Sequence, residues 1–238
     1  MLADFSPAVA DAIHRALREP KNGRKRKVAT FDADGTLWDR DIGEAFMRWL
    51  VVGDLLPQYR GRADLYQEYE ARVAKNRTEG YAWAVQVMAG LPADTLALWC
   101  RQFVHAWPNY RAPMLTLVKE LTACDVEVWI VSATCRPLVQ AAAPLVGIPV
   151  ERTLGIETRV QGGVLTDELV QPVTSEQGKV VAIEQHIGVR PALAFGDSMG
   201  DFPMLCHAVQ PIVVAETRYA NAKLLEHAAQ KQWPVQMF

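Results

Sequence analysis

The sequence lacks the segments that would send the chain into or across a membrane. It has no run of about 20 apolar residues, the length that a helix needs to span a bilayer. Its N-terminus reads as an amphipathic helix, without the basic segment followed by an apolar one that marks a secretory signal. Its four cysteines show no Cys-x-x-Cys spacing, which favours free thiols in a reduced compartment. These absences predict a cytoplasmic protein with no membrane partner.

An excess of charge of either sign is also missing. Lys and Arg number 25 and Asp and Glu 27, for a net charge of -2, so neither nucleic acid nor an anionic membrane is expected as the main partner. The basic run from Gly23 to Lys27 could bind a nucleic acid backbone, but a solvated approach to the first strand is the favoured interpretation. The 238 residues suffice for one substantial domain or for a core with a smaller insertion, and 50% hydrophobic with 22% charged residues is ordinary for a globular protein. A monomer or a homodimer is expected.

Three short apolar runs predict buried parallel strands. They are Val28–Phe31, Val126–Val131 and Ala192–Phe195, and each ends at a polar residue. Helix-like segments accompany the later runs, at Met114–Ala123, Pro137–Leu145 and Lys179–His186. This alternation predicts an α/β fold with a doubly wound, mainly parallel sheet.

Residues 39–111 interrupt the sheet pattern and predict an inserted helical cap. Helices are expected at Gly43–Val52, Ala63–Arg77, Tyr81–Met88 and Asp94–Ala106. The predicted core is therefore 1–38 with 112–238, and the predicted cap is 39–111. Gly162-Gly163 predicts the turn of a β-hairpin within 155–165, at the edge of the sheet.

Ligands bind at the carboxyl ends of the strands in such sheets. That rule gathers Asp32, Asp34, Ser132 and Asp197 at one rim, although they are far apart in sequence.

Four segments in order resemble the motifs of the haloacid dehalogenase-like hydrolase superfamily. They are DADGTL at 32–37, VSAT at 131–134, Lys179 in SEQGKV, and GDSMGD at 196–201. The layout, with a helical cap after the first motif, is similar to the branch that includes phosphoserine phosphatase. The resemblance implies a Rossmann-like core and phosphate chemistry.

The residue types suit that chemistry. Asp32 can attack phosphorus and form an acyl-phosphate, which divides one difficult displacement into two easier ones. Because a carboxylate and a phosphate repel each other, a cation is needed between them, and Mg²⁺ takes carboxylate and phosphate oxygens. Asp32 and Asp197 are the expected metal ligands, and the resemblance adds the main-chain carbonyl of Asp34.

The remaining motif residues have supporting roles in this hypothesis. The Asp34 carboxyl group can protonate the leaving alkoxide and then act as base for hydrolysis. Ser132 and Lys179 would stabilise the charge on the phosphoryl oxygens, and Asp201 would fix Lys179 or a metal-bound water. Further residues expected around the phosphate are Gly35, Thr36 and Ala133.

The leaving group should meet Trp38 and Asp41, which directly follow the catalytic loop. Asp41 falls where phosphoserine phosphatases carry an acidic residue that binds the substrate ammonium group. Those enzymes also place an arginine in the cap where this chain has Ala84, which argues against phosphoserine itself. The aromatic residues of the cap could form a cation cage, although packing is favoured for most of them. They are Trp49, Tyr66, Tyr69, Trp83, Trp99 and Trp107.

Together these features predict a Mg²⁺-dependent phosphatase that hydrolyses a small phosphorylated metabolite through an aspartyl-phosphate. A phosphotransferase with the same intermediate is the main alternative. A 2-haloacid dehalogenase is disfavoured by Asp34, and a catalytically silent ligand-binding protein is disfavoured because no motif position is eroded.

Overall fold

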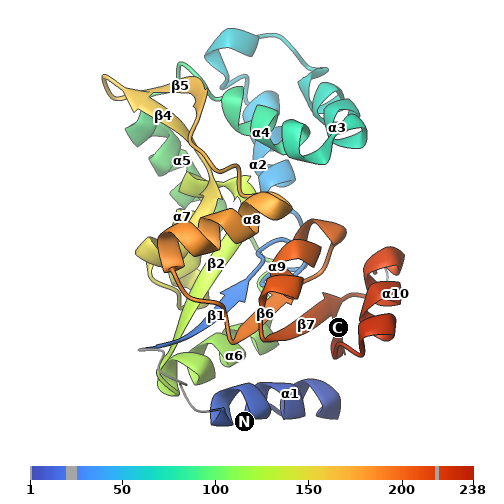
Figure 1. Cartoon of the computed structure of the whole chain (residues 1–238). Coiled ribbons are helices and arrows are strands. Elements are labelled where there is room, and N and C mark those ends of the chain that lie inside the picture. Colours follow the sequence, from blue (N-terminus) through green and yellow to red (C-terminus); the bar gives the residue numbers. More distant parts are fainter. Residues whose placement is uncertain (1, 20–25, 218–219) are drawn as a thin grey trace.

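A six-stranded parallel sheet forms the centre of the molecule (Figure 1). The computed structural model describes residues 2–19, 26–217 and 220–238. The sheet order is β3-β2-β1-β6-β7-β8, and every neighbouring pair in it is parallel. The strands are β1 (Lys27–Phe31), β2 (Val126–Cys135), β3 (Thr153–Ile156), β6 (Leu193–Gly196), β7 (Gln210–Ala215) and β8 (Val235–Met237). The predicted doubly wound α/β class is confirmed.

The three predicted strands form, but β2 is longer than expected. It continues through Ser132 to Cys135, so the prediction that it ends at Val131 is wrong. Of the extra residues, Cys135 pairs with Ile156 of β3, beyond an irregularity in the register after Val131. The strand therefore carries its polar residues up to the rim of the sheet.

Helices cover both faces of the sheet because side chains alternate along each strand. Phe31 and Phe195 point to one face and stack with ring centroids 4.3 Å apart. Val28 and Ala194 belong to a second buried cluster on the other face. The core helices are α1 (Pro7–Arg18), α6 (Ala112–Ala123), α7 (Arg136–Ala142), α8 (Gln177–Ala182), α9 (Phe202–His207) and α10 (Ala222–Lys231).

Four further helices lie above the carboxyl end of the sheet and correspond to the predicted cap (Figure 1). They are α2 (Ile42–Val52), α3 (Leu65–Lys75), α4 (Arg77–Gln86) and α5 (Ala93–His105). Helix α4 begins four residues before its predicted start because Asn76 caps it, accepting from the Glu79 N–H at 3.2 Å. Arg77 and Tyr81 consequently lie one turn apart on the same helix.

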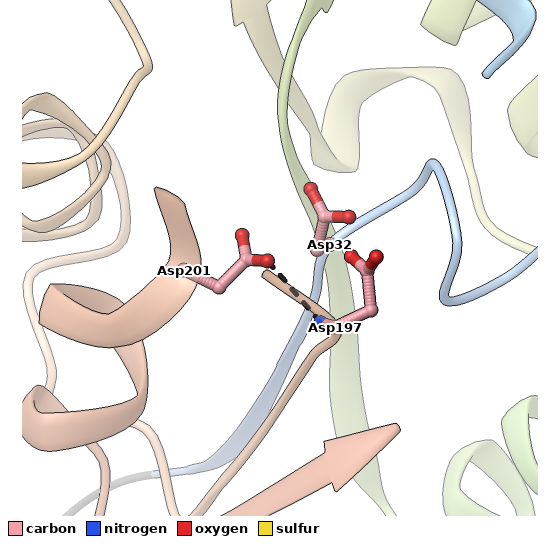
Figure 2. A group of neighbouring side chains, drawn as sticks. All are labelled: Asp32, Asp197 and Asp201. Atoms are coloured by element: carbon pink, nitrogen blue, oxygen red, sulfur yellow. Dashed lines mark hydrogen bonds between the residues drawn. The ribbon is translucent and has the colours of Figure 1, made fainter. Parts of the chain in front are cut away.

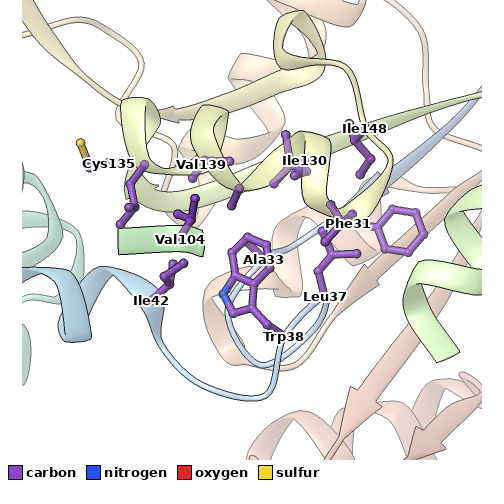
Figure 3. Close-up of a cluster of buried hydrophobic side chains, with 14 of the residues drawn as sticks. Phe31, Ala33, Leu37, Trp38, Ile42, Val104, Ile130, Cys135, Val139 and Ile148 are labelled. Atoms are coloured by element: carbon purple, nitrogen blue, oxygen red, sulfur yellow. The ribbon is translucent and has the colours of Figure 1, made fainter. Parts of the chain in front are cut away.

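The cap and the core share one apolar cluster on this side of the sheet. Figure 3 shows Ile42 and Val104, from the cap, beside Trp38, Cys135 and Val139. All five side chains are at most 5% exposed, so the base of the cap is packed firmly on the core. The exact boundary at residues 39 and 111 stays a prediction.

The hairpin forms with its turn at Gly162-Gly163, but its predicted place at the edge of the main sheet is wrong. Strands β4 (Thr158–Gln161) and β5 (Val164–Leu169) make a separate antiparallel sheet. Leu165 of the hairpin donates its N–H to the Leu91 carbonyl of the cap at 2.9 Å, and its own carbonyl accepts from the Gly90 N–H at 2.9 Å. The main-chain groups at this edge of the hairpin therefore form their hydrogen bonds with the cap loop.

Of the basic run, residues 23–25 lie outside the described residues, whereas Arg26 forms an ion pair with Glu127 at 2.8 Å. No helix among the described residues is long and apolar enough to cross a membrane.

Candidate active site

Asp32 stands at the carboxyl end of β1 and is fixed by Lys179. The Asp32 N–H donates to the Phe195 carbonyl at 2.9 Å, which extends the ladder between β1 and β6 by one residue. Its Oδ1 accepts from Lys179 Nζ at 2.5 Å. Both side chains are buried, and Lys179 comes from the first turn of α8. Burial alone would lower the pKa of Lys179, but the charges of Asp201 and Asp32 raise it above its ordinary value.

Asp201 completes this arrangement from the far side of Lys179. Its Oδ1 accepts from Lys179 Nζ at 2.6 Å. Its Oδ2 accepts from the Asp197 N–H at 3.2 Å (Figure 2). It also accepts from the N–H and the hydroxyl of Ser198, at 3.0 and 3.1 Å. Because both oxygens are occupied by donors, Asp201 holds Lys179 and the turn after β6 in place.

Asp197 brings a second carboxylate next to Asp32 (Figure 2). Oxygens of Asp32, Asp197 and Asp201 lie within 4.8 Å of one another. The neighbouring Gly35 has φ +77, and a Cβ there would lie 2.3 Å from Asp197 Oδ2. Only glycine therefore allows the catalytic loop to come this close to the carboxylate.

The electrostatics of this pair suit a hard divalent cation. Burial, and then repulsion from Asp201, raises the pKa of Asp32 to about 8. The same two causes raise the pKa of Asp197 well above its ordinary value. Both oxygens of Asp201 accept from donors, whereas one oxygen of Asp32 and both oxygens of Asp197 have no donor among the described residues. Carboxylate oxygens are the ligands that Mg²⁺ prefers.

The Asp34 carboxylate accepts three short hydrogen bonds. Its Oδ1 accepts from Trp38 Nε1 and from the Ile42 N–H, both at 2.7 Å. Its Oδ2 lies 2.7 Å from Thr134 Oγ1. Burial raises the pKa of Asp34, and these donors oppose the shift. The side chain is thus fixed from three separate segments of the chain.

A cavity of about 370 Å³ opens beside these groups, between the sheet and the cap. The predicted site residues that line it are Asp32, Asp34, Gly35, Asp41, Ala133, Lys179, Asp197 and Asp201. The first motif, the second motif, the lysine and the last motif therefore meet at one place.

Three predicted site residues do not line this cavity. Ser132 is fully buried in β2, and its Oγ accepts from the Thr134 N–H at 3.0 Å. Thr36 is fully buried, and its hydroxyl has no hydrogen-bond partner among the described residues. Trp38 is also fully buried and contacts Asp34 from behind. The structure thus places Trp38 as a support of Asp34 and away from the space for a leaving group.

Asp41 lines the cavity and also caps the first helix of the cap. Its Oδ1 accepts from the Glu44 N–H at 2.7 Å at the start of α2. Burial, followed by repulsion from Asp34 and Glu44, raises the pKa of Asp41 well above its ordinary value.

The cap aromatics are used mainly in packing. Trp49 contacts Trp99 and Phe103, and of the six candidates for a cation cage only Tyr69 lines the cavity. The lining residues that sequence reasoning missed include Thr134 and Tyr81. Thr134 could have been found, because it lies two residues after Ser132 on the same face of a strand.

A sequence model of the haloacid dehalogenase-like hydrolase family matches residues 29–206. The chain belongs to this family. The matched region contains all four motif segments that meet at the cavity. Among curated protein sequences, none matches this haloacid dehalogenase-like hydrolase.

Solved structures with the same fold are available for comparison. A protein of unknown function from Bordetella pertussis Tohama I has a TM-score of 0.75 at 20% identity, over 88% of this chain and 97% of that one. A phosphoserine phosphohydrolase-like protein from Francisella tularensis subsp. tularensis SCHU S4 has a TM-score of 0.58 at 19% identity, over 79% and 87%. A phosphoserine phosphatase, described as a phospho-aspartyl intermediate analogue, has a TM-score of 0.58 at 17% identity, over 89% and 93%. At these identities the likeness extends to the fold.

Proposed function

We propose that this hydrolase is a Mg²⁺-dependent phosphatase that acts on a small phosphate monoester through an aspartyl-phosphate on Asp32. One observation carries the proposal. Lys179 holds one oxygen of Asp32 at the bottom of the cavity, and the Asp197 carboxylate lies beside it. The phosphoserine phosphatases among the structural neighbours support phosphate chemistry in this fold.

In the first step an oxygen of Asp32 attacks phosphorus, and the bond from phosphorus to the ester oxygen breaks. The departing oxygen takes a proton from the Asp34 carboxyl group. In the second step water attacks the aspartyl-phosphate and gives a proton to Asp34, and the bond between phosphorus and Asp32 breaks to release phosphate. Lys179 offers fixed positive charge to the phosphoryl oxygens in both steps.

Mg²⁺ would be held by the Asp32 and Asp197 carboxylates, with the Asp34 main-chain carbonyl as the ligand that the family resemblance adds. When bound, the ion offsets the negative charge of phosphate and carboxylates at this rim. The raised pKa of both carboxyl groups fits this role, because a buried pair of carboxylates needs a cation in order to be ionised together.

The substrate class is limited to small monoesters by the cavity volume of about 370 Å³. Phosphoserine is disfavoured because Ala84 lines the cavity at the position where the resemblance expects an arginine. The cytoplasmic location and the monomeric or homodimeric state remain predictions from the sequence.

Replacing the nucleophile tests the mechanism. Asp32→Asn should lower kcat on 4-nitrophenyl phosphate by roughly 10⁴-fold or more, because the carboxylate that forms the intermediate is lost. The assay is run with Mg²⁺ and with EDTA, and Asp11→Asn on the exposed face of α1 is the matched control. Equal turnover by Asp32→Asn and the control would refute an aspartyl-phosphate on Asp32.

A further inference from the structure

The two oxygens of Asp34 have chemically different partners. Oδ1 faces the indole N–H of Trp38 and the main-chain N–H of Ile42, each at 2.7 Å. Among the described residues, the partner of Oδ2 is the Thr134 hydroxyl, at 2.7 Å. An indole or amide N–H can donate but cannot accept, whereas a hydroxyl can do either.

This difference decides where a proton can be on Asp34. A proton on Oδ1 would point at two N–H groups that cannot accept it, so both hydrogen bonds would be lost in a buried site. A proton on Oδ2 requires only that the Thr134 hydroxyl rotate from donor to acceptor. Oδ2 is therefore the one oxygen that can alternate between the protonated and the ionised form without breaking the local network.

We infer that Thr134 and Trp38 are positioning residues that assign the two oxygens of Asp34 to different tasks. Trp38, with the Ile42 N–H, keeps Oδ1 as a permanent acceptor, and Thr134 holds Oδ2 at the cavity as the oxygen that gives and takes the proton. This inference rests on the proposed function, because it refines the acid and base step assigned to Asp34.

The surrounding structure is shaped to hold the Thr134 hydroxyl at this point. A Cβ on Gly43 would lie 2.8 Å from Thr134 Oγ1, so the first turn of α2 leaves just enough space for it. On the strand, the Thr134 N–H donates to Ser132 Oγ at 3.0 Å, which fixes the backbone that carries the hydroxyl. Thr134 and Asp34 both line the cavity in which the ester would bind.

The proton balance of the two steps follows from this assignment. When the ester bond to phosphorus breaks, the leaving oxygen takes the proton from Oδ2, and the Thr134 hydroxyl then donates to the ionised Oδ2. When water attacks the aspartyl-phosphate, its proton passes to Oδ2, and the Thr134 hydroxyl turns back to accept. Trp38 and Ile42 continue to donate to Oδ1 throughout.

The test separates chemistry that needs an acid from chemistry that does not. Single-turnover release of the leaving group, with enzyme in excess and Mg²⁺ present, is measured for 4-nitrophenyl phosphate and for benzyl phosphate. Nitrophenolate leaves without a proton, whereas the benzyl alkoxide needs one. Thr134→Val should slow release from benzyl phosphate about tenfold and leave release from 4-nitrophenyl phosphate within about twofold. Thr134→Ser should restore the benzyl phosphate rate, because it restores the hydroxyl.

Thr153→Val is the matched control, since Thr153 is also buried and its hydroxyl, at the start of β3, donates to the Val150 carbonyl away from the cavity. Equal slowing of both esters by Thr134→Val, or no slowing of either, would overturn the assignment. If Thr134→Val unfolds where Thr153→Val does not, Trp38→Phe provides the same comparison by removing the other donor. No hydrolysis of either ester by the unaltered protein would instead refute the proposed function.

Discussion

The two walls of the cavity are built in different ways. On the core wall, Asp32, Asp34 and Lys179 each form short hydrogen bonds to fixed partners. The cap wall contributes Tyr69 and Tyr81, and also Arg77. The hydroxyl groups of both tyrosines and the guanidinium group of Arg77 have no hydrogen-bond partner among the described residues.

This difference separates the reaction from the choice of substrate. Groups that act on phosphate must be in place before the substrate arrives, because fixed dipoles and charges need no rearrangement in the transition state. Polar groups that recognise the leaving group must have no other hydrogen-bond partner, so that they can bind it. The core wall is therefore expected to govern the rate of the chemical steps, and the cap wall the affinity for different leaving groups.

The largest effect should follow from removing the ammonium group at the centre of the core wall. Lys179→Met should lower kcat by roughly 10³-fold or more through the loss of charge stabilisation. It should also lower the free energy of unfolding by about 3 kcal/mol, because Asp32 and Asp201 are left buried without their cation. Urea unfolding and steady-state kinetics measure the two effects.

On the cap wall, Arg77→Met is the matched comparison for Lys179→Met. Arg77 is half-buried and lacks an ion-pair partner among the described residues, so its loss should leave the free energy of unfolding within about 0.5 kcal/mol. If both variants lost similar stability, the proposed difference between the walls would be wrong.

The metal should matter next, through Asp197. At a concentration about a hundred times its Kd, a bound ion adds about 2.7 kcal/mol to the free energy of unfolding. Mg²⁺ should therefore raise the Tm of the unaltered protein and have little effect on Asp197→Asn. An unchanged Mg²⁺ response in Asp197→Asn would remove this carboxylate from the metal site.

The pH dependence of the free energy of unfolding is a second test of the Asp32 and Asp197 carboxylates. Burial, and then Asp201, raises the pKa of Asp32 from 3.8 to about 8, so the folded protein binds more protons than the unfolded chain between those values. The free energy of unfolding of the metal-free protein should then fall as pH rises through this window. Saturating Mg²⁺ should weaken the dependence, because it binds the ionised carboxylates. Urea unfolding at several pH values, with EDTA or Mg²⁺, measures both effects.

Most of the core wall could be predicted from the sequence. Short apolar runs that end in Asp32 and Asp197 identify parallel strands, and the sheet geometry then brings their ends together. The direction in which individual side chains point could not be predicted. Trp38 follows the catalytic loop directly, yet it points behind Asp34, because a turn reverses the chain between them with the N–H groups of Leu37 and Trp38 donating to Ala33 O.

The cap wall was harder to predict because its geometry depends on helix packing. The four helices were expected, but the earlier start of α4 at Arg77 depends on one side-chain cap at Asn76. Likewise, the glycines at 162 and 163 predicted a hairpin turn, but not that the hairpin would bond to the loop at Leu91. Short strands such as β8 depend on their neighbours and have little signal of their own.

Within the cap wall, the effects should be moderate and should depend on the leaving group. Tyr81→Phe keeps the ring and removes a hydroxyl that has no hydrogen-bond partner among the described residues. The KM should therefore rise up to about tenfold for esters whose leaving group bonds to it. The kcat on 4-nitrophenyl phosphate should change little. A panel of phosphorylated metabolites, assayed with Tyr81→Phe and Arg77→Met side by side, would show which esters each residue reads. A uniform loss of kcat across the panel would place Tyr81 with the core wall.

The smallest effect should come from the hydrogen bond that joins the two walls. Thr78 Oγ1, in the first turn of α4, lies 3.0 Å from Ser175 Oγ in the loop that leads to Lys179. A neutral hydrogen bond of this kind contributes about 1 kcal/mol, so Thr78→Val and Ser175→Ala should each lower the free energy of unfolding by about that amount. Since each variant removes the same bond, the double variant should lose little more than either one. Additive losses would mean that the bond contributes nothing. If KM also shows coupling in this double-variant cycle, the position of the cap is linked to the loop that leads to Lys179. The two walls would then differ in their residues but move together.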